Sequence, residues 1–264
     1  MKLILSEEQQ FLKDTAQSFA RDKTPTNHIR KLRDDGNAKC WDDSIWQEMV
    51  QLGWSGILVP EEFGGSDFGI AGISVIMQEL GKTLTPSPLL ATSVLGVSTI
   101  KLLGSDEQKK NYLPKIVSGE ATTALAVDEG NHHNPFDIEA TATLEDNKWI
   151  LNGQKVFIID GASADLILIV ARTSGKKGES NGLSVFITDK NSTGLEVSQI
   201  STADCRNYAN LVMSNLTLNA DALLGEVDIA GEIMEQVLDL GRIAMASDML
   251  GNTCLLYTWN AADE

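Results

Sequence analysis

The sequence predicts an α+β protein whose chain passes through three successive parts. As far as about residue 120, apolar residues recur every three to four positions, which is typical of amphipathic helices. From about residue 121 they alternate at every second position, which indicates strands, and from about residue 229 the helical spacing returns. We therefore expect an N-terminal all-helical domain over 1–120, a middle domain built as a small β-sandwich or barrel over 121–225, and the first helix of an incomplete C-terminal helical domain over 226–264.

Length, charge and cysteine content narrow the classes of function. The 264 residues include 21 basic and 37 acidic side chains, so the formal net charge at pH 7 is −16. Surfaces that follow nucleic-acid phosphates need clustered Lys and Arg, and we therefore expect no nucleic-acid partner. The three cysteines form no CxxC pair, so neither a disulfide framework nor a metal site is expected.

The sequence contains no pattern of a targeting signal or a membrane span. Residues 1–8 have neither the apolar core of a signal peptide nor an Arg-rich transit pattern. The longest apolar run, Leu166 to Ala171, is far too short to cross a bilayer. We expect a cytoplasmic protein without a membrane span.

Two capping boxes mark helix starts in the first part. In the segments 6–9 (SEEQ) and 105–108 (SDEQ), a Ser and the Gln three residues later can each satisfy a backbone N–H at the helix start. Pro86 and Pro88 are expected to break the chain before an apolar helix. Helices are expected, in order, after Ser6, from about Asp42 to Gly53, around Ile73 to Leu80, from Leu89 to Leu103, and from Ser105 toward Gly119.

Alternating segments and turn residues divide the middle part into strands. Residues 138–144 alternate, residues 145–148 are expected to turn, and Asn152-Gly153 is expected to form a second tight hairpin, because this dipeptide is a common two-residue turn. Residues 173–181, rich in Gly, Ser and Lys, are expected to be a solvated loop. Further strands are expected at 155–159, 166–170, 183–188, 195–200 and 211–218.

The helical pattern after residue 229 has one apolar face. Ile233, Val237, Leu240, Ala244 and Ser247 are spaced to be buried together. A single amphipathic helix after a β domain cannot bury both of its sides alone. We therefore expect this helix to open a further helical domain.

Four segments in this arrangement resemble the acyl-CoA dehydrogenase family. They are residues 59–66 (VPEEFGGS), 113–120 (LPKIVSGE), 151–158 (LNGQKVFI) and 238–242 (LDLGR), in the family's order and at its spacings. The resemblance covers essentially the whole chain but about two thirds of a typical member. It implies FAD between the β domain and the C-terminal helices, an acyl-CoA thioester against the flavin, an electron-transferring flavoprotein as partner, and a homo- or hetero-oligomer of related subunits.

The resemblance also implies which residues contact the cofactor. The family's flavin-contacting Thr-Glu-Pro-x-Ala-Gly-Ser-Asp segment corresponds to residues 128–135 (DEGNHHNP). Asp128 then stands where a Thr meets the pyrimidine edge, and Asn134 where a Ser meets both flavin and substrate. An ionised Asp accepts hydrogen bonds only and repels an anionic reduced flavin. The resemblance also places Leu125, three residues before this segment, among the cofactor contacts.

A second flavin contact, Trp-Ile-Thr or Trp-Ile-Ser in the family, corresponds here to Phe157, Ile158 and Ile159. The resemblance gives Phe157 the role of an aromatic wall beside the ring, while burial in the core is an equally open alternative. Ile159 has no hydroxyl to offer the flavin. Because two contact positions are altered, we expect the purified chain to retain little FAD.

The resemblance assigns acyl-CoA and active-site-loop contacts to Asp239 and Arg242. Since unpaired burial of a charge is costly, we expect Arg242 to face a buried anionic partner. In some branches the catalytic Glu directly precedes this Arg, where Gly241 stands here, and no catalytic residue is assigned in this chain. Removing a thioester α proton needs a carboxylate base, while the β hydride passes to the flavin.

Three functions remain open from the sequence. The first is an acyl-CoA dehydrogenase flavoenzyme, the second a non-catalytic structural subunit of a heteromeric dehydrogenase, and the third a plain acyl-CoA-binding or scaffold protein. For His132 and His133 we expect a polar surface loop, because no third metal ligand is spaced nearby. Asp128 and Glu129 are neighbours on an extended segment, so they should face opposite ways and not form an acid–base pair.

Overall fold

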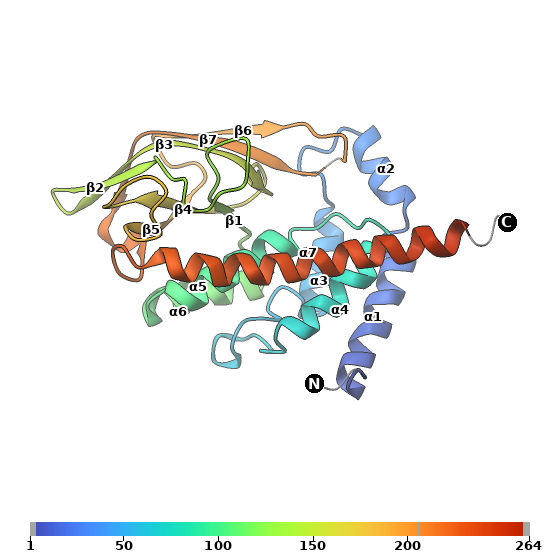
Figure 1. Ribbon diagram of the computed structural model, residues 1–264. Coiled ribbons are helices and arrows are strands. Elements are labelled where there is room, and N and C mark those ends of the chain that lie inside the picture. The colour runs from blue at the N-terminus through green and yellow to red at the C-terminus, as the bar shows by residue number, and fades with distance from the viewer. Residues whose placement is uncertain (1–3, 205, 261–264) are drawn as a thin grey trace.

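The computed structural model describes residues 4–204 and 206–260, without the side chains of 255 and 257–260. Cys205, the side chain of Trp259 and the last four residues of the expected third part lie outside this description. A layer of helices carries a curved β-sheet above it (Figure 1). The sequence's prediction of helices, then strands, then a helix is confirmed.

The N-terminal part is helical throughout. Its elements are α1 (Glu7–Lys23), α2 (Asn27–Asp34), α3 (Asp43–Gln51), the short η1 (Glu61–Phe63), α4 (Ile70–Gly81), the π-helix η2 (Leu89–Gly96), α5 (Val97–Leu103) and α6 (Asp106–Val117). Both predicted capping boxes form: the hydroxyls of Ser6 and Ser105 accept the N–H of the Gln three residues later at 3.2 Å. Helix α2 was not predicted, because Leu32 is its one buried side chain and no side chain caps its start.

The middle part contains the strands β1 (Thr123–Ala126), β2 (Thr141–Glu145), β3 (Lys148–Ile159), β4 (Leu166–Arg172), β5 (Leu183–Asp189), β6 (Leu195–Ile200), β7 (Tyr208–Asn219) and β8 (Leu223–Leu224). They pair in the order β6-β7-β3-β2-β4-β5-β8, with β1 parallel to β4. β2 and β4 share one paired position, Thr141 with Arg172, so the β6-β7-β3-β2 half and the β4-β5-β8 half of the sheet are joined by a single pair. The half that contains β3, β6 and β7 forms the site described below.

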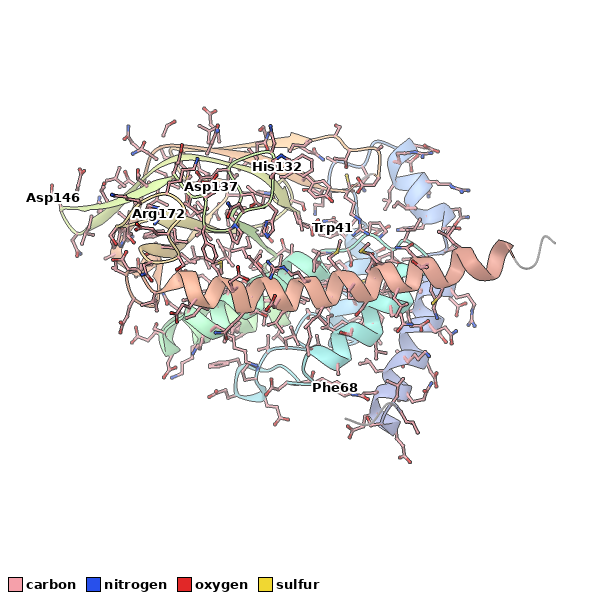
Figure 2. All side chains as sticks on the ribbon, viewed as in Figure 1. Trp41, Phe68, His132, Asp137, Asp146 and Arg172 are labelled. Carbon is pink, nitrogen blue, oxygen red and sulfur yellow. The ribbon has the colours of Figure 1, made fainter. Side chains whose placement is uncertain are left out.

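The prediction of a second hairpin at Asn152-Gly153 is wrong. The chain reverses once, at Asp146 and Asn147, whose φ angles of +47° and +61° suit a two-residue turn that follows the twist of the strands. Figure 2 places Asp146 at the outer tip of this hairpin. Asn152 and Gly153 lie inside β3, where the pairing with β7 shifts register, and a Cβ at Gly153 would come within 2.7 Å of Ala140. Here the Gly serves a bulge and a close approach rather than a turn.

Helix α7 (Ala230–Asn260) lies along α4, η2 and α5. Among its described side chains, the buried positions are Ala230, Gly231, Met234, Val237, Gly241, Ala244, Asp248 and Gly251. Apart from Gly231, they are spaced alternately four and three residues apart. Of the face expected from the sequence, Val237 and Ala244 are buried, whereas Ile233, Leu240 and Ser247 are only half-buried. The opposite face exposes the apolar side chains Ile243, Met249, Leu250 and Leu256.

Close backbone contact fixes α7 against α4. A Cβ added at Gly251 would lie 2.0 Å from the carbonyl oxygen of Gln78, and one at Gly81 would lie 2.2 Å from that of Asp248. Both clashes are with backbone atoms, which cannot turn aside as a side chain can. No helix in the described part of the chain is long and apolar enough to cross a membrane.

The first testable prediction concerns this contact. Gly251→Ala should lower the free energy of unfolding by about 1–3 kcal/mol, because overpacking outweighs the usual helix preference for Ala. Thr253→Ala, on the exposed side of the same helix, is the control and should change stability by less than about 0.5 kcal/mol. Urea denaturation of both variants measures the difference, and a stabilised Gly251→Ala would contradict this packing.

Candidate functional site

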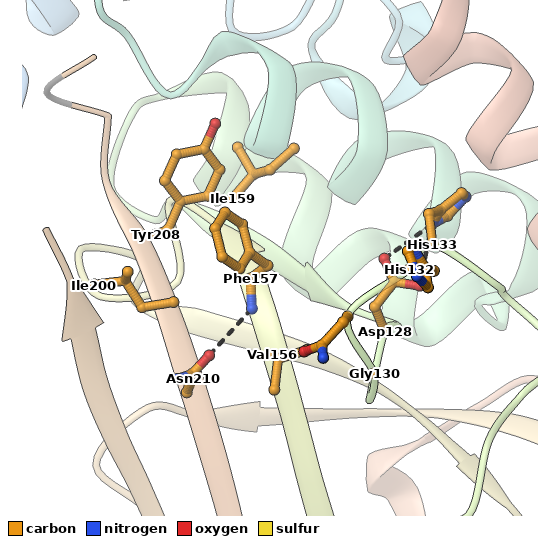
Figure 3. Close-up of a pocket in the computed structure, with 11 residues that line it drawn as sticks. Asp128, Gly130, His132, His133, Val156, Phe157, Ile159, Ile200, Tyr208 and Asn210 are labelled. Carbon is orange, nitrogen blue, oxygen red and sulfur yellow. Dashed lines mark hydrogen bonds and ion pairs between the residues drawn. The ribbon is translucent and has the colours of Figure 1, made fainter. Parts of the chain in front are cut away.

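A pocket of about 620 Å³ opens where four segments of the β domain meet (Figure 3). Its walls come from the loop 128–133 after β1, from residues 156–159 at the end of β3, from Ile200 at the end of β6, and from the start of β7. Three of the cofactor contacts expected from the resemblance, Asp128, Phe157 and Ile159, line it, and so do His132 and His133. We refer to it as the Phe157 pocket.

Phe157 faces the pocket and not the core. Val156 and Phe157 together oppose Asn210 of β7, since the pairing moves from Lys155–Leu211 directly to Ile158–Ala209. This bulge gives Phe157 a φ of +54°, which is strained for a bulky residue, and leaves the residue 59% exposed. The core alternative for Phe157 is therefore wrong.

The ring of Phe157 forms an aromatic wall together with Tyr208. The two ring centroids lie 5.2 Å apart at an angle of 47°. The backbone N–H of Phe157 donates to the side-chain oxygen of Asn210 at 3.2 Å, which satisfies the donor that the bulge removed from the ladder. The pocket thus has one flat, apolar side held in a defined position.

A buried lysine holds the loop after β1 against β3. Lys155 is fully buried, and its ammonium donates to the carbonyl of Val127 at 2.9 Å and to the carboxylate of Glu129 at 2.7 Å. The Glu129 carboxylate also accepts the backbone N–H groups of Glu139 at 2.7 Å and of Ala140 at 3.1 Å. Burial lowers the pKa of Lys155 to about 8, while Glu129 opposes that shift.

Asp128 lies on the other side of the same segment. Its carbonyl accepts the N–H of Val156 at 2.8 Å, and its carboxylate lies 2.8 and 3.0 Å from Nδ1 of His133. The N–H of Asn134 donates to the same carboxylate at 3.1 Å. Asp128 and Glu129 thus have separate partners and form no acid–base pair. The side chain of His133 is 48% exposed, so it lies at the surface as expected, and it is hydrogen-bonded to Asp128.

The remaining predicted contact residues do not line the Phe157 pocket. Leu125 and Ile158 are buried in the hydrophobic core. The side-chain oxygen of Asn134 accepts the N–H of Phe136 at 3.3 Å, beside the loop. Over residues 4–204 and 206–260, no group of three or more His, Cys, Asp or Glu side chains could hold a metal ion.

Asp239 and Arg242 lie on α7, outside the pocket. Arg242 pairs with Asp239 one turn before it and with Glu235 at 3.3 Å, and its side chain is 49% exposed. The expectation of a buried anionic partner for Arg242 is therefore wrong. Two carboxylates of its own helix neutralise the guanidinium at the surface.

Asp160, Tyr208 and Asn210 were not among the residues selected from the sequence. Tyr208 and Asn210 line the pocket only because β7 pairs with β3 across some fifty residues of sequence. Asp160 follows Ile159 directly and is buried, which raises its pKa to about 7 against the opposing charge of Arg206. A charged residue that ends an apolar strand was the available signal for Asp160.

Comparison with known proteins gives consistent matches along the chain. The acyl-CoA dehydrogenase N-terminal domain matches residues 6–120, and the acyl-CoA dehydrogenase middle domain matches residues 125–219. The mitochondrial isovaleryl-CoA dehydrogenase of Pongo abelii is 29% identical over 262 residues, which is 94% of this chain and 60% of that protein. The chain thus spans about three fifths of the length of this curated relative.

Solved structures agree with the sequence matches. A chain from the electron transferring flavoprotein structure of Acidaminococcus fermentans superimposes with a TM-score of 0.83 at 30% identity, over 95% of this chain and 66% of that one. Butyryl-CoA dehydrogenase from Megasphaera elsdenii gives a TM-score of 0.84 at 26% identity, over 95% and 67%.

The second prediction tests the buried pair. Lys155→Met should lower the free energy of unfolding by about 3–5 kcal/mol, because the Glu129 carboxylate would lose its charged partner. Adding Glu129→Gln should recover part of that loss, since the amide oxygen can still accept the two backbone N–H groups. Lys148→Met, an exposed lysine on the same strand, is the control. Equal losses from Lys155→Met and Lys148→Met in urea denaturation would refute the role of the pair.

The third prediction concerns Asp160. Between the ordinary Asp pKa of 3.8 and the folded value of about 7, the folded chain binds more protons than the unfolded one. The stability of the wild type therefore falls as pH rises through this range. Asp160→Asn should be more stable than the wild type at pH 8, by up to about 4 kcal/mol, and the gain should shrink toward pH 4.

Unfolding at pH 4, 6 and 8 measures this gain. Asp146→Asn, at the exposed hairpin tip, is the control variant. A pH-independent effect of Asp160→Asn would show that burial does not perturb this carboxyl group.

Proposed function

Because this chain belongs to the acyl-CoA dehydrogenase family, we propose that it is a flavoprotein component of the α,β-dehydrogenation of acyl-CoA thioesters, and that the Phe157 pocket receives the ring of FAD. One observation carries the proposal. Segments 128–135 and 157–159, which resemble two separate flavin contacts of the family, both contribute residues to the lining of a single pocket. They are far apart in sequence, and β3 brings them together.

The residues of the pocket fit a flat, partly polar ring. Phe157 and Tyr208 offer an aromatic wall, and Ile159 and Ile200 extend it with apolar surface. Asp128 offers an acceptor for a ring N–H. Within the described part of the chain, the backbone N–H groups of residues 130–132 donate to no other protein group and are available to ring carbonyls.

FAD, when bound, would accept the hydride from the β carbon of the substrate. The chain's own residues would hold and orient it: the Phe157 wall fixes one face, and the 130–132 loop with Asp128 addresses the polar edge. We extend the proposal to Asp239 and Arg242 as contacts for acyl-CoA, since both side chains are accessible on α7. An electron-transferring flavoprotein and related subunits in an oligomer are the partners that follow from the same family assignment.

A second candidate, a non-catalytic structural subunit, is favoured by Gly241. This position holds the base in some branches of the family, and here it is a buried Gly whose added Cβ would lie 2.7 Å from Cδ2 of Leu95. A carboxylate cannot be supplied there by this residue. The third candidate is a plain acyl-CoA-binding protein. It predicts no flavin binding, and the FAD titration described next tests it.

The fourth prediction tests the flavin proposal. The purified chain should hold little FAD but bind added FAD, with quenching of flavin fluorescence. Phe157→Ala should weaken that binding roughly ten-fold, about 1.4 kcal/mol, because the aromatic wall is lost. Leu144→Ala, an exposed residue in β2 outside the pocket, should bind as the wild type does. No quenching by the wild-type chain would contradict the proposal.

The fifth prediction separates the two candidate functions. A positioned base contributes roughly a hundred- to ten-thousand-fold to proton transfer. If the chain is non-catalytic, a saturated acyl-CoA incubated with it in heavy water should gain no deuterium at the α carbon beyond the protein-free rate. Mass spectrometry of the recovered thioester measures this exchange. Exchange above that rate would reveal a base and favour the enzyme, even when no FAD is bound.

A further inference from the structure

We propose that His133, held by Asp128, is the group that orients the ligand of the Phe157 pocket, and that protonation of its imidazole strengthens flavin binding. The inference rests on the proposed function, because it takes the ring of a flavin as the occupant. It goes beyond that function by assigning a positioning residue and a dependence on pH to the site.

The geometry fixes the imidazole from one side. Nδ1 of His133 lies 2.8 and 3.0 Å from the two carboxylate oxygens of Asp128. The N–H of Asn134 donates to this carboxylate at 3.1 Å, and the N–H of Val156 donates to the backbone carbonyl of Asp128 at 2.8 Å, which holds the residue in place. With Nδ1 engaged, Nε2 is the ring nitrogen left for a ligand. In Figure 3 the pair stands across the pocket from Tyr208.

Protonation changes what Nε2 offers. In the neutral ring paired with a carboxylate, Nδ1 carries the proton and Nε2 is an acceptor. In the imidazolium both nitrogens donate, and the charge of Asp128 is compensated. The polar edge of a flavin presents carbonyl oxygens, which need donors, and its reduced form is anionic. The protonated pair therefore suits the ring better than the neutral one.

Other titratable groups surround the pair. His132 and Tyr208 line the same pocket, and burial together with the charge of Asp204 raises the pKa of Tyr208, so its hydroxyl stays neutral at pH 8. Behind the loop lies the buried pair of Lys155 with Glu129, and Asp160 is buried beyond Ile159. Both Lys155 and Asp160 titrate near neutral pH. A pH profile of the wild type alone would combine the effects of all these titrations on FAD binding, so the experiment compares variants.

The experiment is a fluorescence titration of FAD at pH 5.5 and pH 8.0. The wild type should bind roughly ten-fold more tightly at pH 5.5, as expected for one charge-assisted hydrogen bond. His133→Gln should lose this pH dependence, whereas His132→Gln, its neighbour in the same loop, should keep it. Asp128→Asn should weaken the dependence, because it frees the imidazole from its fixed position.

A second measurement does not depend on affinity. In NMR spectra of the wild type, the imidazole signal of His133, assigned by its loss in His133→Gln, should shift when FAD is added at pH 5.5. If His133→Gln retains the wild-type pH dependence, or His132→Gln abolishes it, the inference is wrong while the flavin proposal stands. If the wild type binds no FAD at either pH, both are wrong.

Discussion

The buried ion pair between Lys155 and Glu129 is the interaction on which the geometry of the candidate site depends. A fully buried ammonium is tolerable only if its charge is paired and its protons are accepted, and here Glu129 and the carbonyl of Val127 meet that need. Each bond crosses from β3 to the segment after β1. The pair therefore ties together two parts of the chain that local structure alone would leave independent.

The positions of Asp128 and Phe157 on the two sides of the Phe157 pocket depend on this ion pair. With Glu129 turned toward Lys155, the alternation of an extended segment turns Asp128 the other way, toward the pocket. On β3 the bulge directly after Lys155 rotates Phe157 out of the ladder and into the same space. The strain of a positive φ at Phe157 is thus placed at the site and balanced by the rigid pairing on either side.

Ion pairs and close glycine contacts act in different parts of the molecule. Arg242 is neutralised by carboxylates of its own helix, and Lys155 is paired with Glu129 inside the β domain. Close glycine contacts hold α7 on α4, and the same helix packs Gly241 against Leu95, where a larger residue would need the leucine to move.

The sequence by itself determined the features that depend on neighbours along the chain. The capping boxes at Ser6 and Ser105, β6 over 195–200 and the turn at 145–148 were predictable, because turn chemistry and side-chain period act over a few residues. The resemblance likewise led us to expect that residues 128–135 and 157–159 lie at one site. In the candidate site, it identified Asp128, Phe157 and Ile159 as residues of one surface.

Only the tertiary structure decided which side chains meet. Asn152-Gly153 carries a turn sequence, yet pairing with β7 and the approach of Ala140 keep it inside a strand. The partnership of His133 with Asp128 and the burial of Asp160 depend on how a loop folds back and on what covers a strand end. Burial and long-range pairing are properties of the folded chain. The local sequence pattern therefore cannot show which charged residues will lie at the site.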